Sequence, residues 1–256
     1  MPTPAVLLNK MPTPDTMGAP GCWLGGLPTL PPEIEWPWFV YKDQPAVPMH
    51  FMAQINLSHL PRPDGFLDLP STGTLFVFHT PVLPAILPGH DIGCRVFYVE
   101  EDVSQHPFRG MPAFPSISVL PEQGEDWEFN YKDTRMGPLD RWNFDFLVFD
   151  TYEVNTIEIT DWWEEIRYDM AAAQYDRIAS STKLYEDEGV LHHMYGANAT
   201  GWGPVYKDDV NLLAIGTDAD LGFGDVYRVQ WTQFCMKRED LEKRDWTKVW
   251  IEGGGS

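Results

Sequence analysis

The chain has 256 residues, of which 43% are hydrophobic and 14% aromatic, so it can bury a sizeable core and is not wholly disordered. At about 150 residues per domain, this length fits one large domain or two small ones. The 18 basic and 38 acidic residues give a formal net charge of −20, which argues against a protein that binds the nucleic-acid backbone, because neutralising phosphates requires Lys and Arg.

The first segment, 1–37, is dense in Pro and Gly, which predicts an extended chain with many turns. Short strands are predicted after it. The predicted strands are apolar, aromatic or β-branched runs at 51–55, 74–79, 93–99 and 142–159. Within 93–99 the residues alternate with the period of two that a strand requires.

Two further segments lie between these strands. Residues 69–90 carry no charge and are long enough to cross a bilayer, but prolines at positions 70, 81, 84 and 88 would break the helix that a crossing requires. Residues 101–140 are acidic and interrupted by five prolines, which predicts a long irregular connection of the kind that often carries function.

The cysteines and the two ends of the chain bear on its compartment. Cys22, Cys94 and Cys235 are an odd number of widely spaced cysteines, which predicts reduced thiols in a cytoplasmic protein rather than a disulfide framework or a zinc site. The first ten residues lack the basic region and long apolar core of a secretory signal. Residues 253–256 (GGGS) are typical of a linker or a cloning scar.

Helices are predicted at two places. Over 161–179, Thr160 is a suitable N-cap, and an apolar stripe with helical spacing follows. The stripe consists of Trp163, Ile166, Met170 and Ala173. A second, short helix is predicted over 238–246, where it could dock on a sheet near the C-terminus.

One pattern occurs twice. Residues 52–55 form an apolar run that is followed by a glycine and a strand with a central aromatic at 73–78, and 213–215 precede a similar segment at 224–229. This similarity indicates either two duplicated antiparallel strand pairs or a chance likeness, since the gaps within the two pairs differ in length.

Ordered sequence blocks support a family resemblance. The blocks are GGLPTLPPEIEWP (25–37), HFMAQINLSHLP (50–61), LPSTGTLFVFHT (69–80), HHMYGA (192–197), LLAIGTD (212–218), GFGDVYRVQW (222–231) and EDLEKRDWTKVW (239–250). Their order resembles the YwqG-like family, a domain of unknown function numbered 1963, over about residues 20–250. The resemblance implies an α+β fold with antiparallel sheets and no established reaction, and some relatives resemble immunity proteins encoded near bacterial toxins.

Pattern and resemblance together predict one α+β domain over 1–252. We expect antiparallel β-sheets in two similar halves, about 20–150 and 151–252, with the main helix at 161–179 packed on a sheet and a short C-terminal helix. A ligand pocket, where present, is expected where the two halves meet.

Catalytic signatures for nucleotide binding, serine hydrolysis and zinc proteolysis are absent from the sequence. Cys22 with a distant His192 raises a papain-type nucleophile as one hypothesis, and a buried or loop thiol as the simpler alternative. If the protein is a small-molecule enzyme, His192 is the candidate general base and Asp225 the candidate orienting carboxylate. That pairing requires the two side chains to lie within hydrogen-bonding reach.

No metal site is predicted. His192 and His193 are adjacent, so in an extended segment their side chains point to opposite faces and cannot easily share one metal. The acidic glycine loop 218–225 offers Asp218 and Asp220 at alternating positions, but the EF-hand pattern then fails. Calcium binding and a β-turn with solvated carboxylates remain as alternatives for this loop.

The leading hypothesis is a soluble intracellular binding protein of the immunity type, which neutralises a more basic toxin or partner protein. It rests on the net charge, the absence of a catalytic signature and the family's association with toxin genes. The expected interface combines charge with an aromatic anchor, in the acidic stretch 100–102 together with Glu122, Glu125, Asp126, Trp127 and Glu128. No cofactor, nucleic acid or membrane is predicted as a partner; the alternative is that the charge simply keeps the protein soluble.

Overall fold

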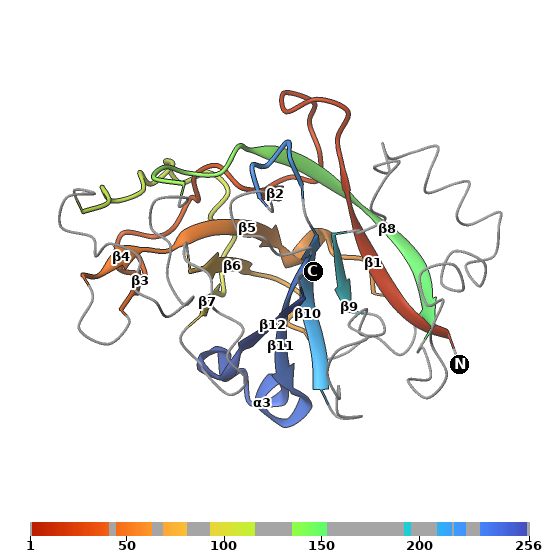
Figure 1. Cartoon of the computed structure of the whole chain (residues 1–256). Coiled ribbons are helices and arrows are strands. Elements are labelled where there is room, and N and C mark those ends of the chain that lie inside the picture. Colours follow the sequence, from red (N-terminus) through yellow and green to blue (C-terminus); the bar gives the residue numbers. More distant parts are fainter. Residues whose placement is uncertain are drawn as a thin grey trace.

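The structure is a computed structural model that describes residues 2–40, 45–62, 69–80, 93–115, 135–152, 192–195, 209–216, 218–223 and 231–254. These residues form a β structure with very little helix (Figure 1). The strands are β1 (Pro2–Lys10), β2 (Trp23–Leu24), β3 (Trp38–Phe39), β4 (Val47–Pro48), β5 (His50–Asn56), β6 (Thr74–His79), β7 (Cys94–Val99), β8 (Trp142–Tyr152), β9 (His193–Tyr195), β10 (Asp209–Gly216), β11 (Trp231–Lys237) and β12 (Trp250–Gly254). The described helices are α3 (Arg238–Glu242) and the 3₁₀ turns η1 (Leu57–His59) and η4 (Trp246–Lys248), and none of them is long and apolar enough to cross a membrane.

Ten of the described strands form one antiparallel sheet, and β3 and β4 form a small second sheet. The order in the large sheet is β12-β11-β10-β9-β1-β8-β2-β5-β6-β7. Its centre is the long pair of β1 and β8, which runs from Pro2 opposite Tyr152 to Lys10 opposite Phe144 (Figure 1). This pair lies between four strands of the N-terminal half of the chain, β2, β5, β6 and β7, and four of the C-terminal half, β9 to β12.

The two halves of the sheet repeat one arrangement. The two-residue strand β2 lies beside β5, and the three-residue strand β9 lies beside β10. A bulge interrupts each longer strand, between Phe51 and Ala53 in β5 and between Asn211 and Leu213 in β10. Each longer strand then pairs with the next strand of its own half, β6 or β11, and that strand pairs with the last, β7 or β12.

The first strand of each half pairs with the other half. β1 precedes β2 in the sequence but lies beside β9, whereas β8 precedes β9 and lies beside β2. The chain also turns in the same way at the end of the two short strands, because Gly25 and Tyr195 both have a left-handed φ, of 60° and 59°. Neither half therefore completes its own sheet without a strand from the other.

The sheet nearly closes on itself, because its two edges come together. The thiol of Cys94 in β7 donates to the carbonyl oxygen of Val249 at 3.5 Å, just before β12. The rings of Tyr98 in β7 and Trp246 in η4 lie 5.7 Å apart. At the end of β12, Gly253 pairs with Thr232 of β11.

Two hydrophobic clusters lie on opposite faces of β5 and β6. Leu75 and Val77 point into the main cluster, which extends through both halves of the sheet. Phe76 and Phe78 point into a second cluster, where the irregular proline-rich segment around Trp36 covers the outer face. Because both faces are buried, the four central residues of β6, 75–78, are all apolar instead of alternating with polar residues.

The expected α+β class is wrong for the described part of the chain. Its α-helix, α3, is shorter than the segment 238–246 expected to be helical, and the predicted main helix at 161–179 lies outside the described residues. Two features replace a layer of helices. Irregular segments cover the outer face of the first half, and near-closure of the sheet buries its inner face.

Candidate functional site

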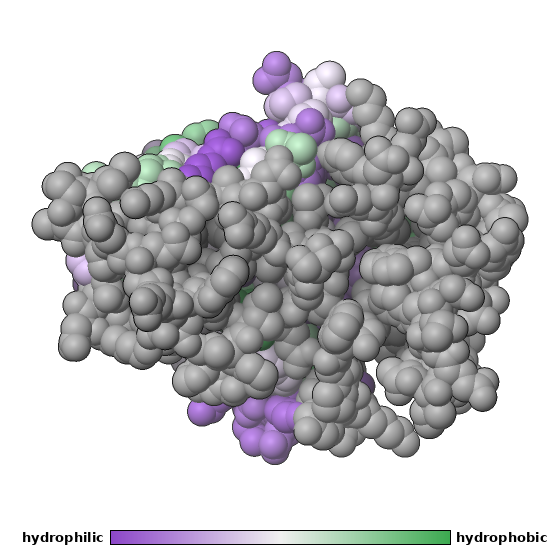
Figure 2. All heavy atoms as spheres, viewed as in Figure 1, coloured by the Kyte–Doolittle hydropathy of each residue, from purple (hydrophilic) through white to green (hydrophobic). Residues whose placement is uncertain are grey.

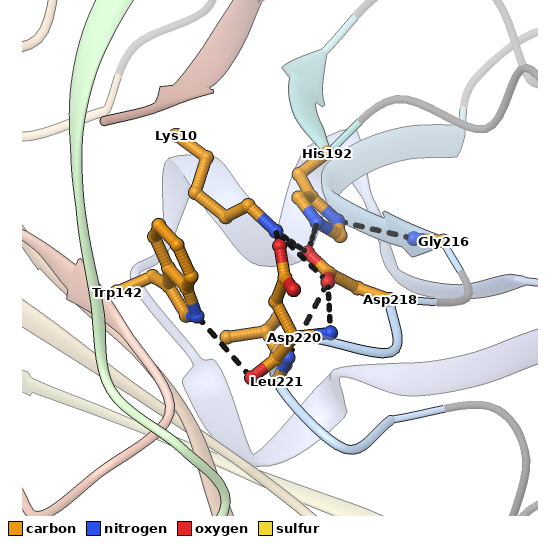
Figure 3. Close-up of polar contacts among 7 residues, drawn as sticks. All are labelled: Lys10, Trp142, His192, Gly216, Asp218, Asp220 and Leu221. Atoms are coloured by element: carbon orange, nitrogen blue, oxygen red, sulfur yellow. Dashed lines mark hydrogen bonds and ion pairs between the residues drawn. The ribbon is translucent and has the colours of Figure 1, made fainter. Parts of the chain in front are cut away.

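A polar cluster lies where β1, β9 and the turn after β10 meet (Figure 3). Lys10, the last residue of β1, places its ammonium 2.9 and 2.8 Å from the two carboxylate oxygens of Asp218. The same nitrogen lies 2.8 Å from Asp220. The Asp218 side chain is 0% exposed and that of Asp220 is 48% exposed, so the first ion pair is buried and the second borders solvent.

His192, directly before β9, completes the cluster. Its Nε2 lies 2.9 Å from Oδ2 of Asp218, and its Nδ1 accepts the backbone N–H of Gly216 at 3.3 Å. Because Nδ1 acts as an acceptor, the ring proton lies on Nε2 and is donated to the carboxylate. Both ring nitrogens are therefore engaged inside the protein.

The Asp218 carboxylate also holds its own turn. Its Oδ1 accepts the backbone N–H groups of Asp220 at 2.9 Å and Leu221 at 3.3 Å, and Asp218 forms a β-bridge with Phe223. Burial opposes ionisation of this group. The hydrogen bonds from His192 and Lys10, with the charge of Lys10, outweigh burial and hold the pKa of Asp218 well below its usual range.

The start of β8 attaches to the same turn. The Trp142 ring lies 4.5 Å from the ammonium of Lys10, and its indole N–H donates to the Asp220 carbonyl at 3.2 Å. Arg135 pairs with Asp140 at 3.1 Å and also donates to the carbonyl of Leu221. The cluster thus ties the turn after β10 to both central strands, β1 and β8.

The comparisons with known proteins give a family. A family model described as a domain of unknown function (DUF1963) matches residues 23–253. The chain belongs to this family. No curated protein matches the sequence. The match spans both halves of the sheet, and the chemistry of this DUF1963 domain has to be inferred from its geometry.

The geometry does not place His192 as a general base. A base needs a ring nitrogen that can reach a substrate, and both nitrogens of His192 are held by Asp218 and Gly216. Asp225, its expected partner, lies outside the described residues, and the carboxylate that the structure places on His192 is Asp218.

In the loop 218–225, the carboxylate of Asp218 already accepts hydrogen bonds from donors of the protein. Both of its oxygens accept from Lys10, His192 or the turn backbone, which leaves this carboxylate poorly suited to a calcium ion. Within the described residues, no group of three or more His, Cys, Asp or Glu side chains is placed to hold a metal. In this DUF1963 domain the cluster is best understood as an anchor for the turn.

Cys22 occupies in the first half the position that His192 has in the second. It precedes the short strand β2, and its Sγ accepts the N–H of Asn56 at 3.2 Å, as Nδ1 of His192 accepts that of Gly216. Burial raises the pKa of the Cys22 thiol to about 12, so the thiol stays protonated at neutral pH. Cys22 is therefore a packed structural thiol, and the papain-type hypothesis has no support.

The expected partner-binding residues, Glu125, Asp126, Trp127 and Glu128, lie outside the described residues. The acidic stretch 100–102 is described, and all three of its side chains are exposed. Sequence reasoning missed Lys10 and Trp142 as members of the polar cluster. The one available signal for Lys10 was a basic residue two positions after the apolar run 5–8, in a chain that carries a large net negative charge.

Proposed function

We propose that this DUF1963 domain is an immunity-type binding protein that neutralises a more basic partner protein. The observation that carries the proposal is that two segments of the first half, 33–40 and 100–108, expose both aromatic side chains and carboxylates. The net charge of −20 and the full engagement of His192 and Cys22 inside the protein support it further.

The exposed residues of these two segments are here called the acidic aromatic face. Its exposed apolar side chains are Trp38 (44%), Val40 (54%) and Phe108 (54%). Its exposed carboxylates are Glu33, Glu35, Glu100, Glu101 and Asp102. In Figure 2, hydrophobic and hydrophilic residues lie side by side along the upper left rim, the side where Figure 1 places the segment that follows β7.

Phe108 and Arg109, at the end of the second segment, are attached to residues before and at the start of the first. The backbone N–H of Arg109 donates to Pro28 at 2.8 Å, and its guanidinium donates to the carbonyl oxygens of Pro31 and Ile34. Phe108 packs edge-on against Trp23, with the ring centroids 5.8 Å apart. The face is thus preorganised, which reduces the entropy lost on binding.

Such a face suits a basic partner. Exposed Trp and Phe are typical anchors of interface hot spots, and surrounding carboxylates speed encounter with a positively charged protein. The sequence-predicted residues 125–128 would add charge of the same sign and one more tryptophan.

The test is the binding of the protein to the product of its neighbouring gene, measured across a range of salt concentrations. Replacing Glu33 and Glu35 by Lys should slow association by roughly tenfold at low salt and flatten its salt dependence. Trp38→Ala should instead speed dissociation. The matched control replaces Glu239 and Glu242 of α3 by Lys, which changes the net charge equally at another exposed site and should slow association much less.

The outcomes separate function from interface. If the wild-type protein neither binds nor protects against that gene product, the immunity function is wrong. If the wild-type protein binds but the two double variants slow association equally, the net charge of the whole protein sets the association rate. The acidic aromatic face is then not the interface.

A further inference from the structure

Arg141, directly before β8, is a partly buried cation that no carboxylate neutralises. The adjacent Asp140 pairs with Arg135, and none of the ion pairs among the described residues includes Arg141. Burial lowers the pKa of its guanidinium, and no neighbouring carboxylate opposes that effect. The group still carries its charge at neutral pH, as arginine does in proteins. In a chain with 38 acidic residues, a partly buried arginine without a counter-ion needs another explanation.

Two aromatic rings hold this guanidinium. Its central carbon lies 4.4 Å from the ring centre of Trp23 and 4.9 Å from that of Phe108. Trp23 is 3% exposed, and its indole N–H donates to the carbonyl of Leu27 at 3.2 Å, so its ring is fixed. Phe108 packs edge-on against Trp23 and is itself 54% exposed. Contact with the faces of aromatic rings stabilises a cation without using its N–H donors.

The surrounding chain fixes the position of Arg141. Gly26 has a left-handed φ of 68°, and a Cβ on it would lie only 2.7 Å from that of Arg141. The Nδ2 of Asn143 donates to the carbonyl oxygens of Pro14 and Thr16, each at 3.0 Å. Its Oδ1 is therefore free to accept from Nη2 of Arg141, at 3.1 Å. The guanidinium is thus held in one place before any ligand binds.

Part of the donor edge of Arg141 is open to solvent. Nε has neither contact with water nor a partner in the described structure, so no ligand reaches it. Nη1 also makes no hydrogen bond within the described structure, but it keeps contact with solvent. Nη2 has a second N–H beyond the one that it donates to Asn143. The two outer nitrogens therefore offer the donors that a carboxylate accepts, at the surface and without a cavity.

We propose that Arg141 binds one acidic side chain of the partner protein, beside the exposed ring of Phe108. This inference rests on the proposed immunity function, because Phe108 belongs to the acidic aromatic face. A carboxylate of the partner would accept from Nη1 and Nη2 while its neighbouring atoms cover Phe108. Such a pair is opposite in sign to the other contacts between an acidic protein and a basic one, so it would fix the register of the two surfaces.

Removal of this charge gives opposite results under two explanations. If only the attraction of an acidic protein for a basic partner matters, Arg141→Gln raises the net negative charge and should speed association. If Arg141 binds a carboxylate of the partner, the same variant leaves that carboxylate unpaired against an acidic surface, and dissociation should be at least roughly tenfold faster. Arg141→Lys keeps the charge but not the planar pair of donors, so it should also speed dissociation.

The experiment measures both rates with the product of the neighbouring gene. The matched control is Arg238→Gln at the exposed start of α3, which changes the net charge equally and should leave dissociation unchanged. Urea unfolding of each variant shows that it is folded when the rates are measured.

A small carboxylate tests the site without the partner. Acetate, titrated into the full chain at constant ionic strength, should shift the Nε–H signal of Arg141 in a ¹⁵N–¹H spectrum to a plateau, because binding at Nη1 and Nη2 changes the electron distribution of the whole guanidinium. Acetamide has the same shape and no charge, so it should shift this signal much less. This titration uses wild-type protein and decides the question even if a variant does not fold.

The outcomes separate this site from the function. If the wild-type protein binds the gene product and Arg141→Gln speeds association without speeding dissociation, Arg141 takes no carboxylate of the partner. If acetate shifts the Arg141 signal no more than acetamide does, the site itself is wrong. If the wild-type protein does not bind the gene product, the immunity function fails, and the acetate titration alone decides whether Arg141 is a carboxylate site.

Discussion

At the scale of single residues, Asp218 is the group on which the polar cluster depends. It has no exposed surface and receives hydrogen bonds from Lys10, from His192 and from the backbone of its own turn. Every one of these groups is a hydrogen-bond donor. A carboxylate accepts from all of them, whereas the N–H₂ group of an amide is itself a donor and cannot accept.

Asp218→Asn should therefore be strongly destabilising. We expect a loss of about 3–5 kcal/mol in the free energy of unfolding, because the change leaves a largely buried ammonium against an amide. Asp220→Asn is the control. Its side chain is 48% exposed, so it should cost less than about 1 kcal/mol. Urea unfolding of the two variants at pH 7 measures both values, and equal losses would contradict the central role of Asp218.

Three buried histidines predict a pH dependence. Burial lowers the pKa of His50 to about 3, that of His79 to about 4 and that of His193 to about 4. The folded protein therefore keeps them neutral between pH 6.5 and 4, whereas the unfolded chain binds protons there. Stability should be fully present above pH 6.5 and fall as the pH falls, by up to about 1.4 kcal/mol per pH unit for each histidine.

Urea unfolding at several pH values from 8 to 5 measures this slope. His193→Gln should reduce the slope between pH 6 and 5 by about one proton. A stability that stays constant from pH 7 to pH 5 would show that the three imidazoles are not held neutral.

Sequence reasoning reached some residues of the site but not the site itself. His192 and Asp218 were both singled out, one as a base and the other as part of an acidic loop. Lys10 joins Asp218 across 208 positions of sequence, and no spacing rule links residues that far apart. The cluster exists because β1 crosses to the second half of the sheet, which a pattern of local residues does not indicate.

At the scale of elements, the strands with continuous apolar runs were predictable and β1 was not. The runs at 51–55 and 74–79 lie in strands, and β7 covers the run at 93–99 except for its first residue, since burial on one or both faces selects apolar side chains. β1 contains prolines at positions 2 and 4, and proline in a strand interior argues against pairing on both sides. β9 has three residues, too few to show any period.

The C-terminal end of α3 predicts a stabilising substitution. Arg244 is exposed and has a left-handed φ of 56°, and its N–H bonds to the Leu241 carbonyl while that of Asp245 bonds to Asp240. This is the Schellman arrangement, in which glycine is preferred at the position of Arg244. Arg244→Gly should stabilise the protein by about 1 kcal/mol, because it removes the strain of a left-handed side-chain-bearing residue.

Lys243 provides the control, one residue earlier. Its φ is −79°, a value that any residue adopts, so Lys243→Gly should destabilise by about 0.5–1 kcal/mol through the entropy of the unfolded chain. Thermal unfolding of the two variants should shift in opposite directions. A shift in the same direction would mean that strain at residue 244 does not matter.

At the scale of the whole molecule, the exchange of first strands makes the two halves depend on each other. Sequence reasoning expected two similar halves that each form antiparallel sheet, and the described strands do repeat one arrangement. It could not foresee that β1 and β8 change places, because that exchange alters no local pattern. The main hydrophobic cluster then includes residues of both halves.

This dependence predicts that the protein unfolds as one cooperative unit. Leu8 in β1 is 1% exposed in the main cluster, so Leu8→Ala should cost about 2–5 kcal/mol. Amide hydrogen exchange shows which strands are destabilised, because the slowest-exchanging amides report the free energy of global unfolding. The slow amides of β6 in one half and of β11 in the other should lose the same protection, since β1 holds β8 on one side and β9 on the other. If β11 loses protection while β6 keeps it, the halves are separate folding units and the exchanged strand does not couple them.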